Sequence, residues 1–301
     1  MGDIPGGGNR QVGNKILVGT ASWTDNTLLE SGWYPKTADD PAKRLAFYAS
    51  KFPIVEVDAT YYHPPAEATA VSWVNRTPDD FVFNIKAFSL LTGHPTKPSA
   101  IFKDLRPETD KKNIYPDDLA PQAYEDLWSR FLSAIEPLHA AGKLGALLFQ
   151  FPPWFTIRRD NKQYILEVAR RCSPLPAVIE LRNSTWFTGD NQAETLEFLR
   201  KHHLPFVCVD MPQGYKSSIP PVVAATADLA VMRFHGHSEH WNSRDIHEKF
   251  GYDYSDKELR SWVPKLRKLS AEAAQVHVLM NNCRGDFAQR NAATLLGMLE
   301  D

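Results

Sequence analysis

The chain has 301 residues, of which 43% are hydrophobic and 23% charged, and its formal net charge at pH 7 is −2. This length and composition are those of an ordinary globular protein with one large domain or two small ones. Acidic and basic residues nearly balance, which argues against nucleic acid or an anionic membrane as the partner and favours a small-molecule ligand.

Residues 1–14 form a polar, glycine-rich segment that we predict to be a disordered leader. The segment lacks the apolar core of a secretory signal, and no stretch of the chain reaches the length of a membrane span. The three cysteines, Cys172, Cys208 and Cys283, have neither zinc-finger nor CxxC spacing, which is typical of a reducing compartment. The sequence therefore predicts a cytoplasmic protein without membrane-spanning segments, and it does not indicate an oligomeric state.

Eight short apolar segments follow in chain order. Each has the length of a strand and is rich in Val, Ile, Phe or Leu, which is typical of parallel strands buried on both faces. The segments are ILVGT (16–20), IVEVD (54–58), FVFNIK (81–86), GALLFQF (145–151), AVIELR (177–182), PFVCVD (205–210), LAVMRFH (229–235) and VHVLMNN (276–282).

Amphipathic segments with helical spacing alternate with these strands, at residues 41–52, 67–76, 123–142, 161–172, 191–203, 256–270 and 288–300. Gly142 is a predicted helix stop, and Pro264 predicts a kink or break in its helix. The connection over residues 211–228 is proline-rich and poor in helical pattern. We predict a single α/β domain over residues 15–301, folded as a (β/α)₈ TIM barrel. An open doubly wound sheet is the alternative, but no glycine-rich phosphate loop follows the first strand.

The connection over residues 88–120 is unusually long for a compact domain. Because a loop that follows a barrel strand opens onto the catalytic face, the segment could serve as a lid. A surface excursion packed beside the barrel is the other interpretation, and the sequence leaves both open.

Polar side chains recur at alternate positions, on one face of each strand, in the C-terminal halves of the strands. Successive side chains of a strand point to opposite faces, and a helix-facing position would bury such charges at high cost. We therefore predict that these residues line the barrel interior and its C-terminal mouth, where barrel enzymes carry their active sites. They are Glu56, Asp58, Lys86, Gln150, Glu180, Arg182, Asp210, Arg233, His235, Asn281 and Asn282.

Aromatic residues in the loops that follow the strands are expected at the same mouth. They are Trp23, Tyr61, Tyr62, Trp154 and Trp186. We include Trp23, Tyr61 and Trp186 among the predicted substrate-binding residues, because aromatic rings at the entrance of a site can stack on a ligand.

The strand-end motifs, taken together, resemble the family catalogued as domain of unknown function 72, also called YecE-like. They are GTASW (19–23), GWYP (32–35), VEVDATYYHPP (55–65), TPDDFVFNIKA (77–87), LLFQFPPWF (147–155), IELRNSTWF (179–187), MRFHGH (232–237) and NNCRGDFAQRNA (281–292). The resemblance covers the chain from about residue 16 to its end. It implies a (β/α)₈ barrel, comparable with xylose isomerase-like barrels, and no established reaction.

Recurring polar positions of that family match Glu56, Lys86, Gln150, Glu180, Arg182, Arg233, His235, Asn281 and Asn282 here. Three features depart from the family pattern. The usual GxSGW start is GTASW, Asp58 stands where Asn is usual, and the segment at 93–120 is longer than expected.

The leading hypothesis is a metal-independent enzyme that performs acid–base chemistry on a small polar or anionic substrate. Arg182 and Arg233 would bind a phosphate or carboxylate, since guanidinium groups hold such oxygens in pairs. Glu180, Lys86, His235 and Asp210 are the predicted catalytic residues. Glu56, Gln150, Asn281 and Asn282 join the two arginines and the three aromatics as predicted substrate-binding residues. This hypothesis requires no cofactor.

Alternatives from other classes remain open. A metal-dependent hydrolase or isomerase would bind a divalent ion through Glu56, Glu180, Asp210 and His235. Sugar or nucleic-acid chemistry at the aromatic residues ranks lower. The same pocket would also suit a non-catalytic binding protein, and the charges could form a purely structural ion network.

Overall fold

A computed structural model describes residues 15–300, so the predicted leader at residues 1–14 and the last residue lie outside the described part of the chain. Its eight strands are all parallel, in the order β5-β4-β3-β2-β1-β8-β7-β6. They are β1 (Lys15–Ala21), β2 (Ile54–Val57), β3 (Val82–Lys86), β4 (Leu144–Gln150), β5 (Ala177–Glu180), β6 (Val207–Asp210), β7 (Leu229–Phe234) and β8 (Gln275–Met280). A single bridge between Ile179 and Phe206 joins β5 to β6. The predicted (β/α)₈ barrel is thereby confirmed.

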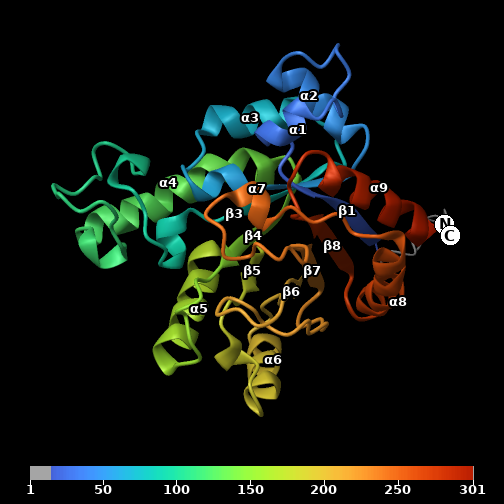
Figure 1. The fold of residues 1–301 in the computed structure, drawn as a ribbon. Helices are drawn as coiled ribbons and strands as arrows, with labels where there is room; N and C mark the ends of the chain where they lie inside the picture. The colour runs from blue at the N-terminus through green and yellow to red at the C-terminus, as the bar shows by residue number, and fades with distance from the viewer. Residues whose placement is uncertain (1–14, 301) are drawn as a thin grey trace, which may run out of the picture.

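Helices surround the strands on all sides (Figure 1). Those at the predicted positions are α2 (Pro41–Ala49), α3 (Glu67–Asn75), α4 (Pro121–Ala140), α5 (Arg159–Cys172), α6 (Asn191–Lys201), α8 (Asp256–Glu272) and α9 (Phe287–Glu300). As predicted, no helix is assigned between β6 and β7. Two short helices were not predicted, α1 (Asn26–Glu30) and α7 (Ile246–Lys249). The predicted stop at Gly142 is confirmed by its φ of +69°, a left-handed conformation that suits glycine after a helix.

The predicted break at Pro264 is wrong, because α8 runs through this residue without interruption. Apolar side chains on both sides of the proline, Trp262, Val263 and Leu266, are buried in the core. Their burial offsets the backbone hydrogen bond that proline cannot donate, so tertiary packing overrides the local preference.

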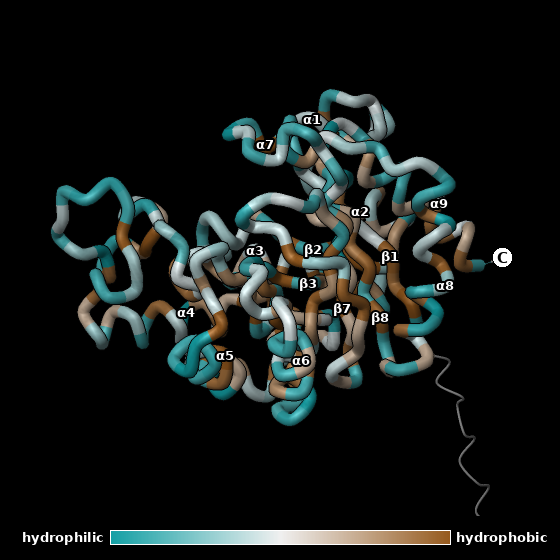
Figure 2. Tube along the Cα trace, turned by 60° about the horizontal axis from the view of Figure 1, so that its bottom comes forward, coloured by the Kyte–Doolittle hydropathy of each residue, from teal (hydrophilic) through white to brown (hydrophobic). Residues whose placement is uncertain are grey.

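The hydrophobic core lies between the strands and the surrounding helices, and the strands are largely hydrophobic in Figure 2. Tyr48 of α2 shows how a polar group enters this layer, since its hydroxyl donates to the Ile54 carbonyl of β2 at 3.0 Å. Between residues 15 and 300, no helix is both long and apolar enough to cross a membrane.

The long segment over residues 88–120 extends away from the barrel beside α4 (Figure 1). It contains the 3₁₀ turns η2 (Ser89–Thr92), η3 (Pro98–Ala100) and η4 (Pro116–Asp118) and closes on itself through an antiparallel bridge between Thr96 and Ile114. Arg130 of α4 pairs with Asp104 and lies 5.1 Å from the Phe102 ring. Most of the segment is thus the packed surface excursion, and its beginning turns toward the mouth of the barrel at His94.

Strand register brings the polar positions to one level. Glu56 of β2 is paired with Asn84 of β3, and Gln150 of β4 with Glu180 of β5. Parallel strands all end at the same face, and of these four residues Gln150 lines the cavity at the C-terminal mouth of the barrel, whereas Glu56, Asn84 and Glu180 are buried.

Candidate functional site

The C-terminal mouth of the barrel contains a cavity of about 410 Å³. We call the residues that line it the cavity wall. Predicted site residues in this wall are Tyr61, Lys86, Gln150, Arg182 and Asn281, together with Asp58 and Tyr62. The remaining lining includes Ser22, Asp25, His94, Ser217 and Lys249, which lie in segments that follow strands.

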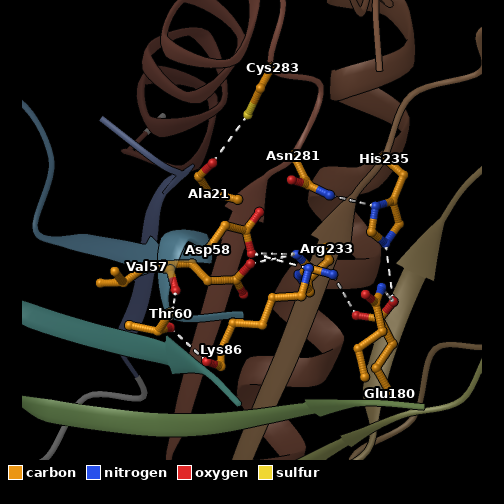
Figure 3. Close-up of polar contacts among 12 residues, drawn as sticks. Ala21, Val57, Asp58, Thr60, Lys86, Glu180, Arg233, His235, Asn281 and Cys283 are labelled. Atoms are coloured by element: carbon orange, nitrogen blue, oxygen red, sulfur yellow. Dashed lines mark hydrogen bonds and ion pairs between the residues drawn. The ribbon is translucent and has the colours of Figure 1, made fainter. Parts of the chain in front are cut away.

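Below the cavity lies a layer of four fully buried charged or polar side chains, Glu56, Glu180, Arg233 and His235, which we call the floor network. Arg233 is its centre (Figure 3). Its Nη1 donates to Glu180 Oε2 at 2.6 Å, and its Nη2 donates to Glu56 Oε1 at 2.5 Å. None of the four lines the cavity.

The floor network is tied to the wall by hydrogen bonds. Glu180 Oε1 accepts from Gln150 Nε2 at 2.6 Å and from Arg182 Nη1 at 2.9 Å. The His235 ring lies between Arg182, 3.2 Å from its Nε2, and Asn281, 2.8 Å from its Nδ1. Three wall residues thus take their orientation from buried partners.

Burial and neighbouring charges fix the protonation states in the floor network. Burial raises the pKa of Glu56 to about 8, against the opposing effect of Arg233. For Glu180 burial acts in the same direction, but Arg233, His235 and Arg182 together hold the pKa of its carboxyl well below its usual range. Burial lowers the pKa of His235 to about 3. At neutral pH Glu180 is therefore an anion and His235 a neutral ring.

Cations predominate on one side of the cavity wall. Lys86 Nζ lies 3.3 Å from Asp58 Oδ1, and Arg182 is paired with Glu180 below it. Lys249 of α7 forms no ion pair with any carboxylate among residues 15–300, and its ammonium lies 5.0 Å from the Trp241 ring. Burial, Arg182 and Lys86 lower the pKa of Lys249. Three positive side chains thus converge on one cavity.

His94 and Lys249 are wall residues that the sequence analysis missed. Both belong to loop segments without strand periodicity, so parity gave no signal for either. Burial, with Lys86 and Arg182, lowers the pKa of His94 to about 3, and its Nδ1 lies 2.8 Å from Thr92 Oγ1. His94 therefore contributes a neutral ring to the wall.

Asp210 and Asn282 do not line the cavity, although both were predicted site residues. Asp210 accepts a hydrogen bond from Tyr254 at 2.7 Å and lies 3.0 Å from His237 Nε2. Asn282 donates to the Tyr252 carbonyl at 2.7 Å. Both hold the loop between β7 and α8, the loop that also carries α7 and Lys249. Loop packing occupies both carboxylate oxygens of Asp210 and the amide nitrogen of Asn282. Their predicted contact with a ligand stays a prediction.

Two tryptophans that were predicted to bind substrate, Trp186 and Trp23, do not line this cavity either. Trp186 is fully buried and donates from Nε1 to the Phe155 carbonyl at 2.7 Å. Trp23 packs edge-on against Trp73 and lines a second cavity of about 230 Å³, which shares Ser22, Asp58 and Ala59 with the first. In both cases an indole that could have reached solvent is used to pack a neighbouring helix or turn.

The predicted metal-binding set does not come together. Arg233 lies between Glu56 and Glu180, and Asp210 points to Tyr254 and His237 instead. Within the part of the chain that the structure describes, no three His, Cys, Asp or Glu side chains form a group that could hold a metal ion.

Comparison with known proteins gives a consistent result. The model of the family described as "Protein of unknown function DUF72" matches residues 17–301. The UPF0759 protein YunF of Bacillus subtilis is 31% identical over 294 residues, which is 95% of each chain. Among solved structures, a DUF72 family protein from Enterococcus faecalis is 27% identical, with 95% of this chain and 96% of that chain covered and a TM-score of 0.77.

A DUF72 family protein from Thermotoga maritima is 29% identical, with 95% of this chain and 99% of that chain covered and a TM-score of 0.75. The chain belongs to the DUF72 family, as the sequence motifs predicted.

Proposed function

We propose that this DUF72 protein is an enzyme that binds a small anionic substrate, a phosphate or carboxylate, in the barrel mouth and moves a proton on it. The observation that carries the proposal is the convergence of Lys86, Arg182 and Lys249 on one cavity. Lys86 and Arg182 are each paired with a carboxylate, whereas Lys249 has no such partner among residues 15–300 and is repelled by both cations. A bound anion would relieve that repulsion.

Arg182 is the principal anion ligand in this proposal. Its Nη1 is fixed by Glu180 at 2.9 Å and its Nε donates to the Ser217 carbonyl at 3.3 Å. A guanidinium held in this way presents its remaining donors in a fixed direction, which suits recognition of a carboxylate or phosphate. Lys249 approaches from α7 as a second point charge.

Lys86 and Asp58 are the proposed proton-transfer pair. Both side chains are part of the wall, and Asp58 Oδ1 accepts no hydrogen bond from the described residues. The Thr60 hydroxyl donates to the carbonyls of Val57 and Lys86, at 2.8 and 2.6 Å, and so fixes the backbone beside both groups (Figure 3). An ammonium and a carboxylate in contact can act as acid and base in turn.

Glu180 and His235, which the sequence analysis named as catalytic, act in this proposal as positioning residues. Both are sealed below the cavity, and each contacts Arg182. Their role is to hold the arginine and Asn281 toward the ligand, as buried partners do for the contact residues of many sites.

Isothermal titration calorimetry tests the anion site directly. The ligands are inorganic phosphate, ribose 5-phosphate, citrate and malate, added to the wild type, Lys249→Met and Lys201→Met. Lys201 ends α6 at the opposite end of the barrel and is exposed, so it is the matched control. Loss of a charged hydrogen bond predicts about 10-fold weaker binding in Lys249→Met and no change in Lys201→Met. Equal affinities in the two variants would remove the basis of the proposal.

A non-catalytic binding protein is the second candidate, and the sealed floor network favours it. Lys86→Met separates the two functions. If the wild type converts a bound ligand, the protein is an enzyme, and Lys86→Met should lose that turnover. If the protein only binds its ligand, binding is saturable and neither the wild type nor any variant converts the ligand. We also propose a cytoplasmic location, which the three free cysteines support.

A further inference from the structure

One side of the cavity mouth is built from aromatic rings in contact with one another. Tyr62 packs edge-on against Tyr61 with ring centres 5.1 Å apart, Tyr61 against His94 at 5.3 Å, and His94 against Trp154 at 5.9 Å. We call these four residues the aromatic rim. They follow β2, β3 and β4, three successive strands of the barrel.

The outer members of the aromatic rim are unusually exposed for their size. Tyr62 is 58% exposed and Trp154 is 56% exposed. Tyr61 has Lys86 Nζ 4.9 Å from its ring, whereas no cation lies over Tyr62 or Trp154 among the described residues. Large rings left open beside a cavity mark a binding surface more often than isolated exposed apolar residues do.

Lys86 lies beside the aromatic rim, whereas the other two cations of the cavity wall come from other elements. Arg182 follows β5, and Lys249 belongs to α7 in the loop after β7. A ligand that contacts both the aromatic rim and these two cations must therefore carry its negative charge at one end and a flat surface at the other. Cavities of this size accommodate small organic ligands of that shape.

We propose that the ligand of this site is an anion joined to a planar ring, the chemistry that nucleoside monophosphates represent, with the ring stacked on Trp154 or Tyr62 and the anion bound by Arg182 and Lys249. This inference rests on the proposed anion site and adds the class of substrate to it. His94 is neutral and adds ring surface between the two ends without competing for the anion.

Calorimetric titration of the full chain with matched ligands tests the proposal. Adenosine 5′-monophosphate carries both ends, ribose 5-phosphate carries the anion alone, and adenosine carries the ring alone. Each is titrated into the wild type, Trp154→Ala, Tyr62→Ala and Tyr115→Ala. Tyr115 is 45% exposed in the segment beside α4 and serves as the matched aromatic control.

In the wild type, adenosine 5′-monophosphate is expected to bind about 10-fold more tightly than ribose 5-phosphate, the gain typical of stacking one base on an aromatic side chain. At least one of the two variants Trp154→Ala and Tyr62→Ala should reduce this affinity ratio toward one. The dissociation constant of ribose 5-phosphate should not change. Tyr115→Ala should leave the ratio intact. Circular dichroism confirms that the variants are folded.

A ratio near one in the wild type, or a ratio unchanged in both rim variants, would overturn the proposal while leaving the anion site in place. If neither phosphate binds, or if Lys249→Met leaves both affinities unaltered, the proposed anion site itself fails. The titrations therefore distinguish a failure of the proposed ring stacking from a failure of the proposed anion site.

Discussion

The floor network and the cavity wall contain the same kinds of charged side chain, but they differ in what their charges contact. Arg233 has three carboxyl groups of the protein as partners, those of Glu56, Asp58 and Glu180, whereas Lys249 has none among residues 15–300. Glu56 and Lys86, on neighbouring strands, are fully buried and partly open respectively. A barrel can thus use one layer of charge to hold a second layer in place, and only the second is available to a ligand.

Removing Arg233 should have the largest effect on this arrangement. Arg233→Met removes the arginine that pairs with Glu56 and leaves Glu180 with Arg182 as its remaining arginine partner. Breaking a buried pair in this way costs about 3–5 kcal/mol of unfolding free energy. Urea denaturation measures the loss. Arg290 also contacts two carboxylates, Asp253 and Asp286, but is about half exposed, so Arg290→Met should cost less than about 1 kcal/mol. Similar losses in the two variants would mean that burial does not distinguish the two clusters.

Lys86→Met should spare the fold and remove the chemistry. Lys86 lies in the wall with its charge toward Asp58, so its loss leaves a carboxylate that is partly open to water. Once a substrate has been identified, loss of a general acid–base group should lower turnover by about 10²-fold or more. Rate assays beside urea denaturation provide the measurement. A variant with full turnover would exclude Lys86 as a proton carrier.

Glu56→Gln should change the pH dependence of stability in a defined direction. The folded pKa of Glu56 is raised from 4.5 to about 8. The stability contributed by its neutral form is therefore complete below pH 4.5 and is lost as the pH rises through 8. Relative to Glu56→Gln, the wild type should become less stable between pH 5 and 8.5, as urea midpoints would show. A constant difference across that interval would indicate that Glu56 does not titrate there.

Glu180 should change stability with pH in the opposite direction and is the internal control for this experiment. Its folded pKa lies below the ordinary value, so the stability that its charge contributes is present above pH 4.5 and is lost as the pH falls below that value. Glu180→Gln should therefore change the acid side of the profile and leave its slope between pH 5 and 8.5 unchanged.

The smallest effect is expected at Ser22, on the cavity wall. Its φ of 109° belongs to a region that glycine adopts without strain, and glycine is the residue of the GxSGW pattern at this position. Relief of strain in Ser22→Gly should add about 1 kcal/mol to the unfolding free energy, reduced by loss of the hydrogen bond that Ser22 Oγ accepts from Thr24 N. Ser50→Gly, at a helix end with φ −76°, should give no gain.

Much of this protein could be predicted from its sequence. Strand-length apolar segments that alternate with amphipathic helices predicted a parallel sheet covered by helices, and eight such units without a glycine-rich phosphate loop favoured the barrel over an open sheet. The parity of Lys86 and Arg182 placed them at the mouth, where the structure has them. Parity could not tell how deep a residue lies, so Glu180 and Lys86 received the same prediction although only Lys86 reaches the cavity.

Tertiary structure alone decided the remaining parts of the site. His94 and Lys249 reach the cavity from loop segments, whose course depends on contacts such as those of Asp210 with Tyr254 and His237. The same contacts keep the Asp210 side chain out of the cavity wall. Periodicity encodes which face a side chain takes, whereas its depth and its partners depend on neighbours distant in the chain. For this reason the sequence determined the barrel and one charged face, and only the fold separated the buried floor network from the open cavity wall.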